Sequence, residues 1–545
     1  MAKELVPSTY QKEVLEFVRK NTGNFFIDAV AGSGKTSTLE MVANALDAMV
    51  RAGNPLRILF VAFNKSIAKE LGSRLEKRGI TSVECSTIHS FCLKALNGAY
   101  REYNRSKGRF VAGLKNVESD KYYGLCEAAL EAEKPFLDDF RGTVQGLKKL
   151  VRFLRLTMTS PKNEEDVRDL VYHYDIEGID PNDSHEWDAV YAALQVVLEK
   201  GKRQFLDDGI VDFDDMVVFT ALLKEVKVQG YDYVMVDEAQ DLNKAQLAVI
   251  MKAVKKNGRM GFAGDVFQAI YAFSGADAKS VENIITKTDA TVLPLSVCYR
   301  CPRQVVKLIE HIRPGIKSAD GAPEGTVKLV VRDEFMEMAP EGETIVLCRT
   351  TAPLVAECLN FLRNGIRASV RGRDIGKNLT AMLKKINKSF AGELSSSNFY
   401  EFVGKWQANQ NAMFMNHKNA DEKIALLQDK VDTILAFFDG YLVDRAGQPF
   451  SFDSFEQYVN SKFSDDVRGV VFSTIHKAKG LEYDNVYILR GDKMPHPMVK
   501  NEWEREQEDH LIYVACTRAK RNLYFVDYEV ASLTLPEETA VAVAA

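Results

Sequence analysis

The sequence predicts an α/β fold of two domains, each carrying a mainly helical insertion. Near the N-terminus a strand, a glycine-rich loop and a helix follow one another, and short apolar runs in the C-terminal half indicate the strands of a second α/β domain. Two long segments with helical periodicity interrupt this alternation. At 545 residues the chain is also too long for a single hydrophobic core, which favours several domains.

The first α/β domain is expected at residues 1–93 and 207–294, with a helical insertion at 94–206. The insertion is predicted from helical patterns such as SHEWDAVYAALQVVLEKGKRQF. The second domain is expected at 295–375 and 465–530, with a shorter helical insertion at 376–464 and a flexible tail at 531–545. Its strands are predicted at the apolar runs 327–331, 344–348, 470–474, 485–489 and 522–526.

Composition and charge exclude several classes of protein. No apolar run reaches the roughly 20 residues that cross a bilayer, and the N-terminus lacks the apolar segment of a signal peptide. We therefore expect a cytoplasmic protein, associated with the nucleoid if the cell is bacterial. The pair Cys298 and Cys301 has no second pair to complete a zinc site. The net charge of −5 argues against a surface covered in positive charge but does not exclude nucleic-acid binding, because basic groups can be confined to a channel.

The first candidate site is a phosphate-binding loop. An apolar strand at residues 24–28 leads into AVAGSGKT at residues 29–36, and a helical segment follows. Backbone N–H groups at such a helix start can bind phosphates, a lysine reaches the β- and γ-phosphates, and a hydroxyl holds Mg²⁺. A glycine-rich turn without a ligand is the alternative, since Ala29 replaces the first glycine of the pattern. The residues predicted to bind ATP and Mg²⁺ are Gly32, Ser33, Gly34, Lys35 and Thr36.

The second half of this site is predicted at a pair of carboxylates. The apolar residues 233–236 indicate a buried strand, and Asp237 and Glu238 follow at its C-terminal end. Asp237 suits Mg²⁺ coordination, and Glu238 can orient and deprotonate the attacking water. An Asp-Glu pair alone is a weak signal. In a chain that already has a phosphate-binding loop, it indicates nucleotide hydrolysis.

Further segments resemble, in order, the motifs of the UvrD/Rep/PcrA group of superfamily 1 helicases. They lie at residues 58–71, 86–91, 264–271, 299–300, 474–482 and 513–519. The segments DEAQ, FNKSIA and HKAKGLE resemble the eukaryotic F-box helicase branch more than UvrD itself. No F-box is evident in the sequence. The resemblance implies two RecA-like P-loop NTPase domains, each with a mainly helical insertion: 1B-type in the first and a reduced 2B-type in the second.

The resemblance also assigns residues to ATP binding and hydrolysis. Gln11 matches the group's adenine-reading glutamine, and capping of the helix QKEVLEFVRK is its alternative role. Gln268 would couple the γ-phosphate to DNA. Two arginine fingers would contact the γ-phosphate, a device that can raise rates by roughly 10³–10⁵. The residues expected from the second domain are Tyr299 on adenine, Glu482 near the ribose, and the fingers Arg300 and Arg518.

Contacts with nucleic acid are implied in the same way. Phe273 stands where the group usually has tryptophan and can still stack on a base, whereas Ser274 cannot replace the arginine that follows it there. The residues expected at the nucleic acid are Phe63, Asn64, His89, Phe273, Thr474 and His476.

A basic cluster in the first insertion is a further candidate for phosphate contact. On a helix Lys148, Arg152 and Arg155 would share one face, with Lys149 beside them. A solvated face, with the apolar residues between these cations packed on the other side, is the alternative.

Together these features predict an ATP-dependent 3′→5′ DNA helicase or translocase in replication, repair or recombination. The direction rests on KAKGLE at residues 477–482, which resembles the UvrD-like branch. Expected partners are single-stranded DNA, junctions of single and double strands, and single-strand binding, replication or repair proteins, with no membrane. Three alternatives stay open: a translocase that strips bound proteins with little unwinding, an RNA or RNA–DNA helicase, and a P-loop switch that binds partners without moving.

Overall fold

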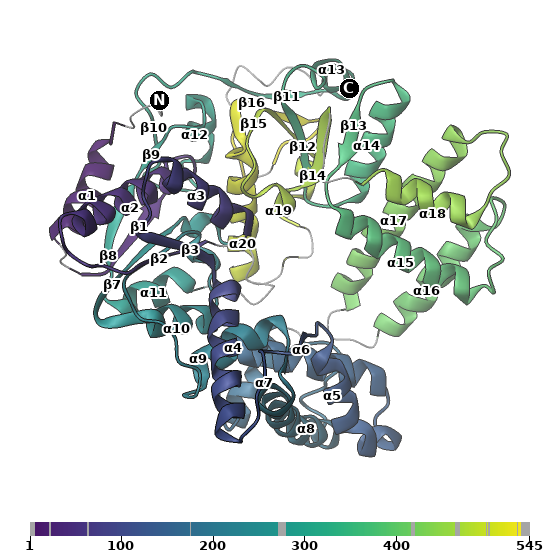
Figure 1. The fold of residues 1–545 in the computed structure, drawn as a ribbon. Helices are drawn as coiled ribbons and strands as arrows, with labels where there is room; N and C mark the ends of the chain where they lie inside the picture. The colour runs from purple at the N-terminus through teal and green to yellow at the C-terminus, as the bar shows by residue number, and fades with distance from the viewer. Residues whose placement is uncertain are drawn as a thin grey trace. The chain divides into compact units, whose positions relative to one another are not determined.

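In the computed structural model the chain divides into two compact units, and each contains one six-stranded sheet with helices around it (Figure 1). Unit 1 comprises Met1–Ala29 and Gly34–Ser296, and unit 2 comprises Val30–Ser33 and Val297–Ala545. The structure describes residues 6–20, 23–62, 65–174, 176–270, 279–415, 420–463, 469–496, 499, 502–530 and 532–535.

The sheet of unit 1 has the strand order β3-β2-β6-β7-β1-β8, and all neighbouring strands are parallel. A parallel sheet covered on both faces takes near-continuous apolar strands, which is the pattern seen in the sequence. The strands are β1 (Phe25–Ala29), β2 (Ile58–Ala62), β3 (Val83–Thr87), β6 (Tyr231–Val236), β7 (Val254–Gly264) and β8 (Thr291–Leu295).

Two cores cover the two faces of this sheet. Because side chains alternate along a strand, Phe25 enters one core and Phe26 the other. The first core contains side chains of α1 (Thr9–Lys20), α2 (Lys35–Arg51) and α3 (Lys65–Lys77). The second contains side chains of α4 (Ile88–Ser106), α9 (Phe213–Leu222), α10 (Lys244–Ala253) and α11 (Ser280–Thr288).

The segment between α4 and α9 is mainly helical and has a separate core around Trp187, which is 1% exposed. Helix α4 runs without a break past residue 94, and the short parallel strands β4 (Asn116–Val117) and β5 (Ile210–Val211) pair where the segment leaves and returns. Its helices are α5 (Lys121–Leu130), η1 (Glu131–Phe136), α6 (Phe140–Thr157), α7 (Glu164–His173), α8 (Ser184–Arg203) and η2 (Gln204–Asp208).

The sheet of unit 2 is also fully parallel, with the order β11-β16-β15-β12-β14-β13. The five apolar runs predicted as strands are all strands, within a few residues at each end. The sixth, β13 (Ala368–Val370), is too short for its sequence to indicate it. The predicted strands are observed as β11 (Thr326–Val330), β12 (Thr344–Cys348), β14 (Val470–Thr474), β15 (Tyr483–Leu489) and β16 (Ala519–Val526).

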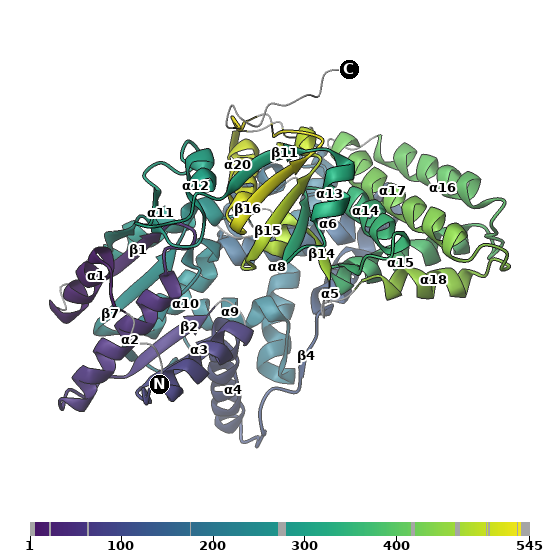
Figure 2. The ribbon, with the colours of Figure 1, turned by 90° about the horizontal axis from the view of Figure 1, so that it is seen from above.

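Between β13 and β14 the chain forms a group of helices that lie together beside the unit 2 sheet (Figure 2). Stacked aromatic rings hold this group, with Phe399 and Phe438 centred 3.8 Å apart. The group contains α15 (Arg373–Ser389), α16 (Phe399–Phe414), α17 (Ala420–Asp444) and α18 (Phe452–Ser461). The other helices are α12 (Arg303–Ile309), α13 (Arg332–Met338), α14 (Ala352–Arg363), α19 (Ile475–Ala478) and α20 (Glu502–Cys516).

The predicted fold class is thus confirmed: both units are α/β, and each carries a mainly helical segment. Within the described ranges, no helix has the length and apolar character needed to cross a membrane.

Candidate active site

Residues predicted from distant motifs meet at the carboxyl edge of the unit 1 sheet. Strands β6, β7 and β1 are neighbours, so the segments that follow them lie side by side. Ligands of open parallel sheets bind at this edge. Lys35 follows β1, Asp237 and Glu238 follow β6, and Gln268 follows β7.

Lys35 lies between the two carboxylates. Its Nζ is 2.6 Å from Glu238 Oε1 and 3.6 Å from Asp237 Oδ1. Burial alone would lower the pKa of Lys35, but Glu238, Asp237 and the more distant Asp265 outweigh it and raise that pKa. Lys35 is therefore a permanent cation at neutral pH, as a residue that neutralises phosphate charge must be.

Thr36 and Asp237 supply a pair of oxygens suited to Mg²⁺. The Thr36 hydroxyl lies 3.5 Å from Asp237 Oδ2, and Asp237 is 4% exposed. Burial raises the pKa of Asp237, the Lys35 cation opposes that shift, and the Glu238 carboxylate adds to it. A hydroxyl beside a carboxylate at a phosphate loop fits the oxygen ligands that Mg²⁺ prefers.

Glu238 is oriented by a residue that the sequence reasoning missed. The Gln240 amide donates to Glu238 Oε2 at 2.6 Å and accepts from the Asp265 N–H at 3.2 Å. Gln268 in turn donates to Asp265 Oδ2 at 2.8 Å. A Cβ on Gly264 would lie 2.6 Å from the Gln240 amide oxygen, so the glycine makes room for it. Gln240 thus connects the ends of β6 and β7, and its only sequence signal is its place two residues after Glu238.

The glycines of the phosphate loop take conformations that L side chains rarely adopt. Gly32 has a φ of 67° and Gly34 a φ of 82°, which places the loop backbone directly before α2. The Ser33 hydroxyl is buried and has no hydrogen-bond partner among the described residues. An orphaned polar atom in a loop of this kind is a site for an anion.

Gln11 lies beside this loop but is already hydrogen-bonded. Its amide oxygen accepts from the Ser8 N–H at 2.9 Å, and the Gln11 N–H donates to the Ser8 hydroxyl, so the two residues form a capping box at the start of α1. The amide nitrogen donates to the Thr38 hydroxyl at 3.0 Å. Gln11 therefore has the helix-capping role that was the alternative to adenine binding. Its amide also lies at the phosphate-binding loop.

Three of the residues predicted for ATP gather within unit 2. Arg300 forms an ion pair with Glu482 and donates to the Thr517 carbonyl at 3.1 Å. Arg518 is 1% exposed and donates to the Val514 carbonyl at 2.8 Å. Burial and the nearby Arg300 guanidinium lower the pKa of Arg518 to about 10, so it stays charged at neutral pH.

Tyr299 is 57% exposed, in the C-x-x-C segment that also contains Arg300. Its neighbour Cys298 accepts a 3.3 Å hydrogen bond from the Cys301 N–H. Within the described residues no cluster of three metal-ligating side chains is present.

The residues predicted at nucleic acid lie on two sheet edges. In unit 1, His89 follows β3, an edge strand of the sheet that is separated by β2 from the strand β6 that carries Asp237 and Glu238. In unit 2, Thr474 ends β14 and His476 follows it at the carboxyl edge. Glu482 and Arg518 directly precede β15 and β16 at the amino edge. The unit 2 sheet therefore separates its two groups of predicted residues. Phe63, Asn64 and Phe273 lie outside the described residues.

Phe213 is an exposed aromatic that the sequence reasoning missed. It is 54% exposed at the start of α9, and its ring meets the His89 ring edge-on at 6.3 Å. Burial lowers the pKa of His89, and Asp214 partly opposes that shift. The sequence gives one indication of this exposure: Phe213 is an aromatic residue within the acidic segment VDFDD.

The basic cluster of the first insertion does not present a free cationic face. Arg155 is 5% exposed and contacts Asp212 at 3.0 Å and Asp215 at 2.6 Å, so the prediction that it meets phosphates is wrong. A buried guanidinium enclosed by carboxylates cannot reach a ligand. The other cations are also paired: Lys148 with Asp120, Lys149 with Glu177 and Arg152 with Asp214.

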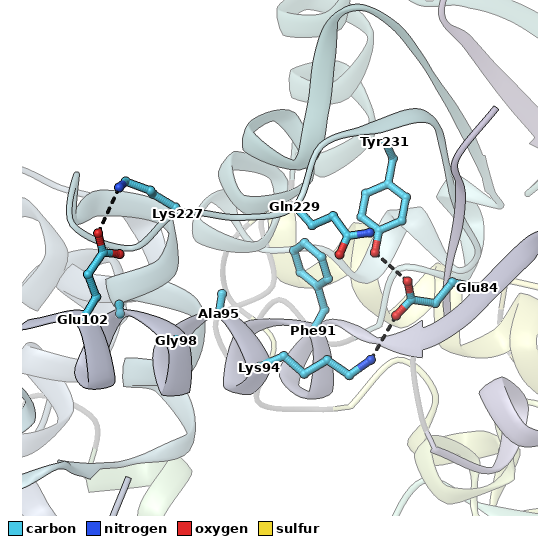
Figure 3. A pocket seen from close by; sticks show the side chains of 10 residues that line it. Glu84, Phe91, Lys94, Ala95, Gly98, Glu102, Lys227, Gln229 and Tyr231 are labelled. Carbon is cyan, nitrogen blue, oxygen red and sulfur yellow. Dashed lines mark hydrogen bonds and ion pairs between the residues drawn. The ribbon is translucent and has the colours of Figure 1, made fainter. Parts of the chain in front are cut away.

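A pocket of about 320 Å³ in unit 1 lies apart from these residues (Figure 3). Glu84, near the start of β3, accepts from the Tyr231 hydroxyl at 2.6 Å and from Lys94 at 2.9 Å. Tyr231 begins β6, so the pocket opens at the amino edge of the sheet, opposite the nucleotide residues. None of the predicted site residues lines it.

Comparison with known proteins matches the chain to a helicase family. The UvrD/REP helicase N-terminal domain matches residues 10–289, about half of the chain, and the UvrD-like helicase C-terminal domain matches residues 469–526. The ATP-dependent DNA helicase UvrD2 of Mycobacterium tuberculosis is 24% identical over 93% of this chain and 77% of its own. The ATP-dependent DNA helicase PcrA of Staphylococcus epidermidis is 23% identical over 94% and 83%. The F-box DNA helicase protein 1 of Schizosaccharomyces pombe is 22% identical over 95% and 57%.

Proposed function

The chain belongs to the UvrD/REP helicase family and is an ATP-hydrolysing DNA helicase, and on that premise we propose that it moves 3′→5′ along single-stranded DNA and separates strands ahead of it. The observation that carries the proposal is the convergence of Lys35, Asp237 and Glu238 at one sheet edge. The helical segments at 94–206 and 376–464 would act as the 1B-type and reduced 2B-type insertions.

Hydrolysis would begin with an exchange of partners at Lys35. Lys35 forms a 2.6 Å ion pair with Glu238. The β- and γ-phosphates of ATP would draw Lys35 away, which frees Glu238 to accept a proton from the attacking water. Gln240 would keep the Glu238 carboxylate in place during this exchange, since it bonds the other oxygen. Gln240 is therefore proposed as a positioning residue and Glu238 as the general base.

Mg²⁺ would be held by Thr36 and Asp237, and it would supply charge neutralisation at the phosphates. Gly32, Ser33 and Gly34 would bind phosphate oxygens through the loop, with the Ser33 hydroxyl as an additional donor. Gln268 would couple the γ-phosphate to DNA and is connected to the rest of this site by its hydrogen bond to Asp265.

Unit 2 would supply the remaining groups. Arg300 forms an ion pair with Glu482, so nucleotide binding would need to separate these two residues. The Glu482 carboxylate would then bind the ribose, and the Arg300 guanidinium would bind the γ-phosphate. Arg518 would have to leave its backbone carbonyl partners to act as a second finger. Tyr299 is exposed and free to stack on the base.

Nucleic acid would bind at His89, Thr474 and His476, together with Phe63, Asn64 and Phe273. The exposed ring of Phe213 beside His89 extends this group, because an aromatic face can stack on any base. Single-strand binding, replication or repair proteins are the proposed protein partners.

The test of the proposed chemistry compares ATPase activity with and without single-stranded DNA in the wild type, Lys35→Ala and Glu238→Gln. We expect DNA to stimulate the wild type and both variants to lose turnover by orders of magnitude while they keep the wild-type circular dichroism. A matched control is Lys20→Ala, whose ion pair with Glu16 is solvent-exposed. Full ATPase activity in Glu238→Gln would contradict the assigned base, and identical rates on RNA and DNA would contradict the DNA preference.

A further inference from the structure

The end of α4 and the loop after it carry an excess of positive charge, although the net charge of the chain is −5. Two carboxylates, Glu102 and Glu118, lie in this stretch. The cations between them and around them are Arg101, Arg105, Lys107, Arg109 and Lys115.

The carboxylates near this helix end are already paired with lysines. Lys227 lies 3.2 Å from Glu102, and Lys107 lies 3.2 Å from Asp207. Three arginines of this stretch are exposed: Arg101, Arg105 and Arg109. In the part of the chain that the structure describes, no carboxylate oxygen lies within 4.0 Å of their guanidinium nitrogens. These three cations are therefore available to an external anion.

Phe110 stands next to these arginines and is 95% exposed. Its loop is fastened to α4, because the Arg109 N–H donates to the Asn104 carbonyl at 2.8 Å and the Leu114 N–H donates to Asn97 Oδ1 at 2.9 Å. The next apolar residues of the loop, Val111 and Leu114, pack against the core. The loop thus half-buries Val111 and Leu114 and leaves the Phe110 ring in solvent.

We propose that Arg101, Arg105, Arg109 and Phe110, the α4 tip, form a second binding surface for single-stranded nucleic acid. The arginines would bind phosphates and Phe110 would stack on a base, the combination that single-strand sites use. The inference rests on the proposed function. Helix α4 begins at the His89 motif and has 19 residues, so it spans about 27 Å, and one strand can reach both of its ends.

The test measures binding of the full chain to a labelled oligothymidylate of about 30 nucleotides, longer than the roughly 4–16 that one compact single-strand site covers. Phe110→Ala should raise Kd about fivefold or more, and Phe110→Trp should restore tight binding. Arg105→Ala with Arg109→Ala should reduce the slope of log K against log salt by about 1.4, at about 0.7 for each phosphate contact. The restoration by Trp is a result that a merely structural role of Phe110 would not give.

Matched controls come from the same unit. Phe136 is also an exposed phenylalanine, at 69%, and Arg203 is an exposed arginine paired with Glu199. Phe136→Ala and Arg203→Ala should keep the wild-type Kd and salt slope. Tip variants that bind like these controls overturn the inference. A wild type that neither binds the oligonucleotide nor shows DNA-stimulated ATPase activity overturns the proposed function instead.

Discussion

Single side chains at the unit 1 sheet edge are the ones that we propose for ATP hydrolysis. Lys35 forms an ion pair with one carboxylate oxygen of Glu238, and Gln240 donates a hydrogen bond to the other oxygen. Motif reading found the charged residues because their chemistry is carried by residue type and spacing. It missed Gln240, because the partners of an amide depend on which strands are neighbours in the sheet.

Gln240→Ala should lower kcat for ATP by about tenfold with little change in KM. The buried amide orients Glu238 and satisfies the Asp265 N–H, and loss of such bonds costs about 1–3 kcal/mol. The control is Gln246→Ala, which removes the capping box of α10. Steady-state kinetics of both variants tests this expectation, and an equal fall in kcat would mean that Gln240 acts only through stability.

Gln11→Ala should narrow the preference for ATP over GTP. An amide can pair with the N6–H and N7 of adenine but meets an acceptor at guanine O6, a difference of about 1–3 kcal/mol. Ser8→Ala is the matched control, because it removes the hydroxyl that accepts from the Gln11 N–H in the capping box while leaving the Gln11 amide. We expect kcat/KM for ATP to fall in Gln11→Ala alone. An unchanged ATP/GTP ratio would leave Gln11 only its capping role.

His476 should make the fold less stable in mild acid. Burial, Arg349 and Lys479 lower its pKa from 6.5 to about 4. As pH falls below 6.5 the unfolded chain takes up this proton first, so stability present above 6.5 is lost progressively toward pH 4. In urea unfolding, the wild type should lose about 2 kcal/mol more than His476→Asn between pH 7 and pH 5. Parallel losses would contradict the lowered pKa.

At the scale of elements, the strands were predicted well and the helix faces less well. An apolar run between turns indicates a strand from local sequence alone, which is why five strands of unit 2 fall where expected. The helical position of Arg155 was also predicted correctly. Its burial was not, because a cation normally marks the solvent side, and here Asp212 and Asp215 of another helix region enclose it.

This buried ion cluster fastens the first insertion to α9. Asp215 receives Arg155 from α6 and also Lys121 from α5, each at 2.6 Å. Removing one member leaves a buried charge without its partner.

Arg155→Met should therefore destabilise unit 1 by about 3–5 kcal/mol. Arg203→Met, which loses one exposed ion pair on α8, should cost at most about 0.5 kcal/mol. Denaturant unfolding of both variants distinguishes the two cases. Equal stability of the two variants would contradict the predicted contribution of the cluster to stability.

At the scale of the whole molecule, each unit carries on its own sheet residues that we propose for ATP and residues that we propose for nucleic acid. In unit 1 both groups follow strands at the carboxyl edge, whereas unit 2 places them at opposite edges of its sheet. The order of motifs along the chain is the basis on which each residue is assigned to one of these two proposed functions. It could not predict this arrangement, because the edge at which a residue lies depends on whether it precedes or follows its strand.

Strand separation on tailed duplexes tests the central claim, ATP-driven 3′→5′ movement on DNA, most directly. The wild type is mixed with ATP and a DNA duplex that carries a single-stranded tail at either the 3′ or the 5′ end, and release of the labelled strand is followed over time. The proposed function predicts release from the 3′-tailed duplex only, and none with Lys35→Ala. Efficient release from the 5′-tailed duplex, or equal release without ATP, would contradict it.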